Sequence, residues 1–157
     1  MRVIIDSDSQ PQKDEIIALL QKYNIKVVIV TSIAHYSRDL NPYAEIIYVD
    51  NKSQEADIKI MNIARENDIV ITADTGLSYF LSGKKVIIIN PKGKIFDARL
   101  AGVKIDIVHI EKKLRRSKAR IKIKGPKPYL KTDLKNLLKT LEKLIVKYNK
   151  DLRFDSN

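Results

Sequence analysis

Short runs of β-branched residues alternate with amphipathic stretches over the first ninety positions of the chain. Each run is bounded by turn-forming or charged residues, as buried strands usually are. The runs that predict strands are 2–5, 25–31, 46–49, 69–72 and 86–89. Together they indicate a sheet of about five strands.

The stretches between these runs carry the spacing of helices. Ile16, Leu19, Leu20 and Tyr23 recur at i, i+3, i+4 and i+7, and Pro11 suits the first turn of such a helix. A second apolar stripe lies on a helix that Ser53 or Asn51 is expected to cap; its members are Ala56, Ile60, Ile63 and Ala64.

Three further helices are expected toward the carboxyl end. The first is short, covers 75–82, and is closed by Gly83 as a typical C′ residue. The second covers about 105–117, where strand-like and helix-like spacings compete. The third is long and terminal, and its apolar stripe is Leu134, Leu137, Leu138, Leu141, Ile145 and Tyr148.

Strands that alternate with helices imply βαβ units and a mainly parallel sheet. The sequence therefore predicts an α/β fold of three layers. A chain of 157 residues fits one domain. We place that domain at 1–149 and expect 150–157 to be a flexible tail.

Composition narrows the class of protein. The chain has no cysteine, so disulfide and thiolate chemistry are excluded. The amino-terminal run turns acidic at Asp6, too early for a signal peptide, and no apolar run approaches the ~20 residues that cross a bilayer. We expect a cytoplasmic protein without a membrane partner. The sequence leaves the oligomeric state open, a homodimer included.

The net charge of +11 is concentrated in one segment. Residues 111–131 carry ten basic side chains against Glu111 alone. Such a segment attracts nucleic acid, although a solvated lysine-rich surface is an equal reading. The candidate nucleic-acid-binding residues are Lys112, Lys113, Arg115, Arg116, Lys118, Arg120, Lys122 and Lys124.

Four aspartates are expected at one edge of the sheet. Asp6 and Asp8 follow the first strand, Asp74 follows the fourth, and Asp57 lies in the first turns of its helix at the border of the buried stripe. Ligands of open α/β sheets bind outside the carboxyl ends of the strands. Clustered carboxylates repel one another, and a divalent cation with oxygen ligands removes that penalty. The pattern favours a site for Mg²⁺ or Mn²⁺.

Each aspartate also has a purely structural interpretation. Asp8 and Asp74 precede helices and could cap them, and Asp57 could complement a helix dipole. Asp6 could serve the turn after the first strand. Ser7, Ser9 and Thr72 could orient a ligand or act as caps, and Asp50 could join the cluster or form a turn.

Several segments, in order, resemble the YaiI/YqxD family of bacterial proteins of unassigned function. Residues 6–11 (DSDSQP) are similar to its D-A-D-A-C-P start, and residues 71–74 (ITAD) to its V-I-T-A-D-I-P-L-A stretch. Residues 55–57 (EAD), 90–93 (NPKG) and 125–129 (GPKPY) resemble three later segments. Gln10 stands where the family has cysteine, which excludes a catalytic thiol there.

The resemblance implies a PIN-like fold, whose nuclease members hold Mg²⁺ or Mn²⁺ with acidic residues at these strand ends. It assigns the metal to Asp6, Asp57 and Asp74, with Asp8 as an accessory catalytic residue. The resulting hypothesis is a metal-dependent nuclease that hydrolyses phosphodiester bonds, in RNA before DNA.

Two other functions stay open. The fold could serve as a nucleic-acid-binding module without catalysis, in which case binding would fall steeply with salt. Asp6 and Asp8 after a first strand also resemble the nucleophile motif of haloacid-dehalogenase-type phosphatases. Against that reading, Gln10 stands where those enzymes have threonine or valine.

Overall fold

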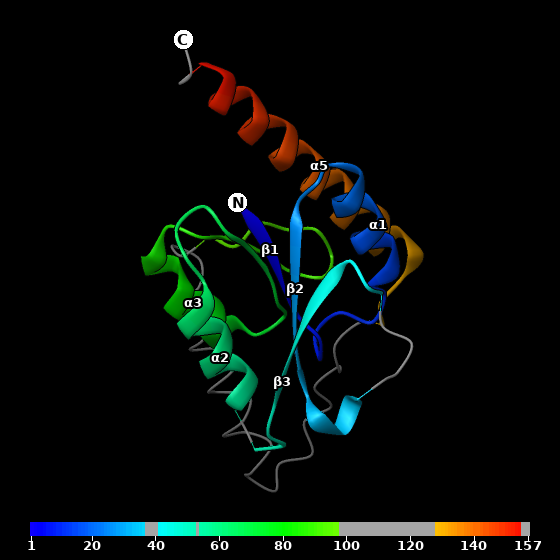
Figure 1. Ribbon diagram of the computed structural model, residues 1–157, viewed down its shortest axis with the longest axis vertical. Helices are drawn as coiled ribbons and strands as arrows, with labels where there is room; N and C mark the ends of the chain where they lie inside the picture. Colours follow the sequence, from blue (N-terminus) through cyan, green and yellow to red (C-terminus); the bar gives the residue numbers. More distant parts are fainter. Residues whose placement is uncertain (37–40, 53, 98–127, 155–157) are drawn as a thin grey trace, which may run out of the picture.

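A parallel sheet forms the centre of the protein. The computed structural model describes residues 1–36, 41–52, 54–97 and 128–154. Neighbouring strands pair in parallel in the order β3-β2-β1-β4-β5 (Figure 1). The strands are β1 (Arg2–Asp6), β2 (Lys26–Ser32), β3 (Ala44–Val49), β4 (Ile69–Ile71) and β5 (Ile87–Ile89). The five predicted strands are confirmed.

Helices cover both faces of this sheet. They are α1 (Asp14–Lys22), α2 (Glu55–Ile63), α3 (Thr75–Leu81) and α5 (Lys131–Phe154), with 3-10 turns η1 (Ile33–His35) and η2 (Ser82–Lys84). Figure 1 shows α1 and α5 together on one side, and α2 and α3 on the other. The predicted three-layer α/β class is therefore confirmed.

The alternation of side chains along β1 explains the two layers of core. Val3 and Ile5 pack with the apolar stripes of α1 and α5, whereas Ile4 packs with those of α2 and α3. Strands buried on both faces read as continuous apolar runs, which is why the sequence pattern located them. The same alternation sends Asp6, two residues after Ile4, toward the α2 and α3 face.

Several predicted helix ends were wrong. Asn51 does not cap α2, because its Oδ1 accepts a hydrogen bond from the Ala34 amide at 3.0 Å. The residue before α2 is Gln54, which has a left-handed φ of 70° and makes no capping bond. Gly83 lies inside η2, and the left-handed residue that ends this segment is Lys85, with a φ of 54°.

Other boundaries differ by a few residues or lie beyond the description. Pro11 precedes α1 instead of joining its first turn, since α1 begins at Asp14. Helix α5 continues to Phe154, into the segment predicted as a tail. Ser53 and the predicted helix 105–117 lie outside the described residues. No helix among the described residues is both long and apolar enough to cross a membrane.

A tight turn fastens β5 to the terminal helix. Gly93 has a φ of 82°, its amide donates to the Asn90 carbonyl, and its own carbonyl accepts from Thr140 Oγ1 at 2.9 Å. A methyl group on Gly93 would lie 2.6 Å from the backbone of Asn136 and Leu137 in α5. Glycine at this position therefore permits both the turn and the close approach of the helix.

Candidate active site

The connections of β1 and β4 diverge at the carboxyl edge of the sheet. The chain leaving β1 leads to α1 on one face, and the chain leaving β4 leads to α3 on the other. Adjacent parallel strands whose connections part in this way leave a crevice, where ligands of open α/β sheets bind. Asp6 and Asp74 lie on its two sides.

Asp6 is the most firmly held of the four aspartates. Only 4% of its surface is exposed. The hydroxyls of Ser9 and Thr72 both donate to its Oδ2, at 2.5 and 2.7 Å. Within the described part of the chain neither bond uses Oδ1, which is left for another partner. Two hydrogen bonds to one carboxylate oxygen fix the rotamer of the side chain.

Asp74 has the capping role that was one of the two predicted for it. It is the N-cap of α3, and its Oδ1 accepts from the Leu77 amide at 2.7 Å. Its own amide donates to Thr72 Oγ1 at 3.1 Å, so Thr72 bridges Asp74 to Asp6. The capping interpretation is thus confirmed for Asp74, and the cap sets the carboxylate at the mouth of the crevice.

Asp57 lies in the first turn of α2, where an acidic residue is favoured by the helix dipole. Partial burial raises the pKa of its carboxyl above the usual value, and the charges of Asp74, Asp6 and Asp8 raise it further. No hydrogen bond or ion pair joins Asp57 to another described residue. Both the burial and the neighbouring charges disfavour the charged form of the Asp57 carboxyl.

Asp8 is more open to solvent, with 57% of its side chain exposed. It caps no helix, because α1 begins six residues later at Asp14. Its Oδ1 lies 3.8 Å from Nε2 of His35, whose side chain is exposed. Asp50 forms an equally long ion pair with Lys52 at the rim.

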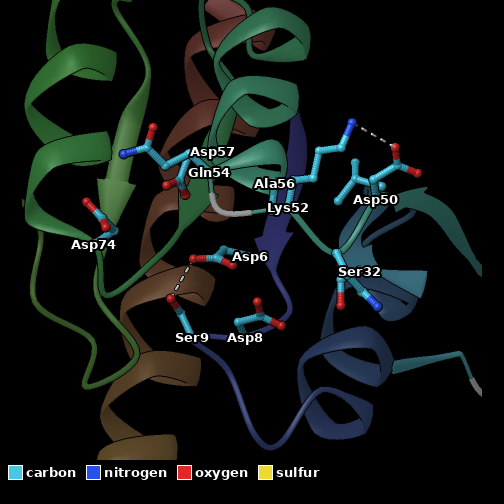
Figure 2. A pocket seen from close by; sticks show the side chains of 12 residues that line it. Asp6, Asp8, Ser9, Ser32, Asp50, Lys52, Gln54, Ala56, Asp57 and Asp74 are labelled. Atoms are coloured by element: carbon cyan, nitrogen blue, oxygen red, sulfur yellow. Dashed lines mark hydrogen bonds and ion pairs between the residues drawn. The ribbon is translucent and has the colours of Figure 1, made fainter. Parts of the chain in front are cut away.

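All four predicted aspartates line one pocket of about 450 Å³. Figure 2 shows Asp57 and Asp74 on one side of the opening, with Asp6 and Asp8 below them and Asp50 across from them. Five carboxylates and no basic side chain except Lys52 are among its lining residues. The fold therefore brings together aspartates that lie up to 68 positions apart in the sequence.

The donor set fits a hard divalent cation. Mg²⁺ prefers oxygen ligands, keeps several waters, and uses one or two carboxylates from the protein. Asp6 and Asp74 each commit one oxygen to a protein hydrogen bond and retain the other. Among the described residues no three acidic or histidine side chains stand close enough to hold one ion together. Water and substrate oxygens would have to complete the coordination.

The site contains two hydroxyls whose role the sequence left open. Ser9 and Thr72 both donate hydrogen bonds to Asp6. The feature of the sequence that pointed to them was their position beside the ends of predicted strands. Ser32 and Gln54 also line the pocket and were not anticipated. The basic candidates Lys112 to Lys124, and His109, lie outside the described residues.

Replacing Asp57 by asparagine is expected to raise the thermal unfolding midpoint of the metal-free protein at pH 7. The unfolded carboxyl has a pKa of about 3.9, below the raised folded pKa. The folded state therefore binds the proton more tightly, and stability falls as pH rises from about 4 through the folded pKa. Thermal unfolding in EDTA from pH 3 to 8 measures this.

The stabilisation by Asp57→Asn should be complete at pH 7 and vanish near pH 3, where the carboxyl is protonated in both states. Glu66→Gln, at the opposite end of the sheet, removes an equal charge and should show no such gain. An Asp57→Asn protein less stable than wild type at pH 7 would contradict a raised pKa of the Asp57 carboxyl in the folded protein.

Comparison with known proteins identifies the family. The model described as "Uncharacterized BCR, YaiI/YqxD family" matches residues 4–147. The chain belongs to the YaiI/YqxD family. The resemblance of its motifs to that family is thus confirmed over nearly the whole chain, including the segments that carry Asp6, Asp8, Asp57 and Asp74.

Relatives of the same kind occur in several bacteria. A UPF0178 protein of Alkaliphilus metalliredigens is 34% identical over 148 residues, which are 94% of each chain. One of Halalkalibacterium halodurans is 34% identical and covers 91% of this chain and 89% of its own. One of Staphylococcus aureus is 35% identical, with 91% and 93% covered. None of these names states an activity.

One solved structure was found to be similar. It is Rae1 (YacP) from Bacillus subtilis, in a W164L mutant, with a TM-score of 0.43 and 17% identity. The alignment covers 78% of this chain and 87% of that one.

Proposed function

We propose that this member of the YaiI/YqxD family is a nuclease that hydrolyses phosphodiester bonds in RNA with a divalent cation, Mg²⁺ or Mn²⁺. The observation that supports this most is the pocket that Asp6, Asp8, Asp57 and Asp74 line together. An acidic pocket repels a phosphate backbone unless a cation is bound in it, so the two ligands are expected to bind together.

A divalent cation held by these aspartates would stabilise charge on the phosphate oxygens and would lower the pKa of a bound water, so that the water can lose a proton and act as the nucleophile. The residues of the chain hold the carboxylates in position. Ser9 and Thr72 hold Asp6 so that its Oδ1 points away from these bonds. The cap of α3 holds Asp74 in the same way. Asp6, Asp57 and Asp74 are the proposed cation ligands, with Asp6 and one of the other two on the same ion.

Asp8 has a different proposed role. Its side chain is 57% exposed, and it lies on the loop between β1 and α1. A carboxylate there can accept a hydrogen bond from a water that approaches the phosphate from solvent. We assign Asp8 to the positioning of that water or of a second cation.

The proposal is tested by incubating the purified protein with labelled single-stranded and hairpin RNA in Mn²⁺, in Mg²⁺ and in EDTA. Cleavage is expected with either metal and is expected to be absent in EDTA. Equivalent DNA substrates are cleaved less if the preference for RNA holds. Cleavage of RNA that persists in EDTA would contradict a metal-dependent reaction.

The same experiment separates the other two candidate functions. Salt-sensitive RNA binding without turnover in any divalent cation would favour a non-catalytic binding module. Release of phosphate from p-nitrophenyl phosphate, with an acyl-phosphate on Asp6, would favour a haloacid-dehalogenase-type phosphatase. The net charge of +11 is consistent with either form of nucleic-acid binding and does not decide between them.

A further inference from the structure

A second pocket of about 390 Å³ lies next to the acidic pocket and shares Asp8 with it. Its floor is apolar, formed by Ile29 of β2 and Ile46 of β3, which are register partners in the sheet. Both belong to the core layer on the α1 and α5 face. The loop after β1 therefore separates two hollows, one acidic and one with an apolar floor.

One buried hydroxyl that lines this pocket, and another on the neighbouring strand, have no hydrogen-bond partner among the described residues. They are Oγ1 of Thr31, which lines the pocket, and the hydroxyl of Tyr48. Thr31 is only 5% exposed, and Tyr48 is its register partner on β3. A buried hydroxyl left unpaired costs about 1–3 kcal/mol, so such groups usually meet a ligand or water.

Lys13 and His35 are the basic residues that line the pocket. Burial lowers the pKa of the Lys13 ammonium below its usual value, although the charges of Asp8, Asp14 and Asp6 act in the opposite direction. A half-buried ammonium that has lost hydration gains from an anionic partner. His35 lies on the other side, with its Nε2 near Asp8.

An exposed aromatic ring borders the same region. Tyr36 follows His35 directly, and 63% of its surface is exposed. Its ring lies over that of Tyr48, with the centroids 5.4 Å apart and the planes tilted by 40°. The ring of Tyr36 is thus held in place by a neighbour while much of its surface stays open. Unpaired bases of single-stranded nucleic acid stack on rings presented in this way.

We infer that this second pocket binds an unpaired nucleotide of the RNA strand, next to the phosphodiester that lies in the acidic pocket. The inference rests on the proposed function. Thr31 Oγ1 would bond the base or ribose, Tyr36 would stack on a base, and Lys13 would pair with a phosphate. The apolar floor favours a nucleotide over a bare anion, because Ile29 and Ile46 offer nothing to a phosphate alone.

The test is titration of the full chain with adenosine 5′-monophosphate in EDTA, followed by NMR of isoleucine methyl groups. The methyl resonances of Ile29 and Ile46 are expected to shift together with one dissociation constant. Inorganic phosphate at the same concentrations should shift them little. No response of these methyls to the nucleotide, or an equal response to phosphate, would overturn the inference.

Two variants separate binding from a structural role. Thr31→Val keeps the shape but removes the hydroxyl, and should weaken nucleotide binding about threefold to tenfold. Its unfolding midpoint should be unchanged or higher, because an unpaired buried hydroxyl is lost. Tyr36→Leu should weaken binding about tenfold. Tyr79→Leu, which removes another half-exposed ring on α3, is the control and should bind as wild type.

The outcomes for this pocket and for the nuclease are distinguishable, because the titration needs neither a metal nor turnover. Nucleotide binding at Ile29 and Ile46 without RNA cleavage would contradict the proposed nuclease activity and support the proposed nucleotide site. Suppose instead that RNA is cleaved with a metal, and that the Thr31→Val and Tyr36→Leu variants bind the nucleotide as tightly as wild type. This result would contradict the nucleotide site alone and leave the nuclease proposal standing.

Discussion

Replacing Asp6 by asparagine is expected to reduce metal-dependent RNA cleavage at least about a hundredfold while the protein stays folded. Loss of an outer partner of a metal ligand already costs about 10–100-fold, so loss of a direct ligand should cost more. Asparagine has the shape of aspartate, and the hydroxyls of Ser9 and Thr72 can rotate to accept from its amide. Initial cleavage rates in Mn²⁺ measure the effect.

The control for Asp6→Asn is Glu66→Gln. Glu66 is an exposed residue paired with Lys85, away from the carboxyl edge of the sheet, and its loss changes the net charge by the same amount. The control should cleave at the rate of wild type. If Asp6→Asn retained full activity, Asp6 would not hold the cation, and the assignment of Asp57 and Asp74 would lose its basis.

Replacing Gly93 by alanine is expected to destabilise the protein by about 3 kcal/mol. A left-handed backbone costs a residue with a Cβ about 1–2 kcal/mol, and a methyl group forced against the α5 backbone adds roughly 1–3 kcal/mol. For a domain of this size that corresponds to a fall of about 10 °C in the unfolding midpoint. Thermal and urea unfolding measure the change.

Gly83→Ala is a matched control, because a methyl group on Gly83 would meet no atom within 4 Å and its φ is ordinary. This change should be neutral or stabilise by up to about 1 kcal/mol. Equal destabilisation by both substitutions would mean that the turn at 90–93 does not hold α5 as the structure indicates.

Much of the fold follows from local sequence pattern. Strands buried on both faces, such as β1 and β4, contain short continuous runs of valine and isoleucine without the spacing of an amphipathic helix. Helix ends were less predictable, because α2 begins at a left-handed Gln54 without a capping side chain. Lys85, not Gly83, supplies the left-handed residue after α3, a choice set by the path of the chain into β5.

The acidic pocket was predictable in outline. Strand ends of a parallel sheet meet at one edge, which places Asp6 near Asp74 whatever the side-chain details. The register of β1 with β4 determines how deeply Asp6 is buried and which two hydroxyls bond to it. The spacing of residues in the sequence does not fix that register. The raised pKa of Asp57 likewise depends on where α2 packs.

The second pocket could not have been predicted from motifs. Thr31 and Tyr48 become neighbours only through the pairing of β2 with β3, and Lys13, just before α1, lines the pocket together with Thr31. Each of these residues is ordinary by itself, a strand threonine, a strand tyrosine and a surface lysine. They indicate a binding site only because hydroxyls are buried without partners, and this is a property of the folded chain that the sequence does not show.

The most direct test of the proposed cation site is a crystal structure of the protein soaked with Mn²⁺, with anomalous data collected. We predict an anomalous peak in the acidic pocket within ligand distance of Asp6 and of Asp57 or Asp74, with water completing the coordination. The peak should be lost in Asp6→Asn. An acidic pocket without an anomalous peak at saturating Mn²⁺ would contradict the central proposal.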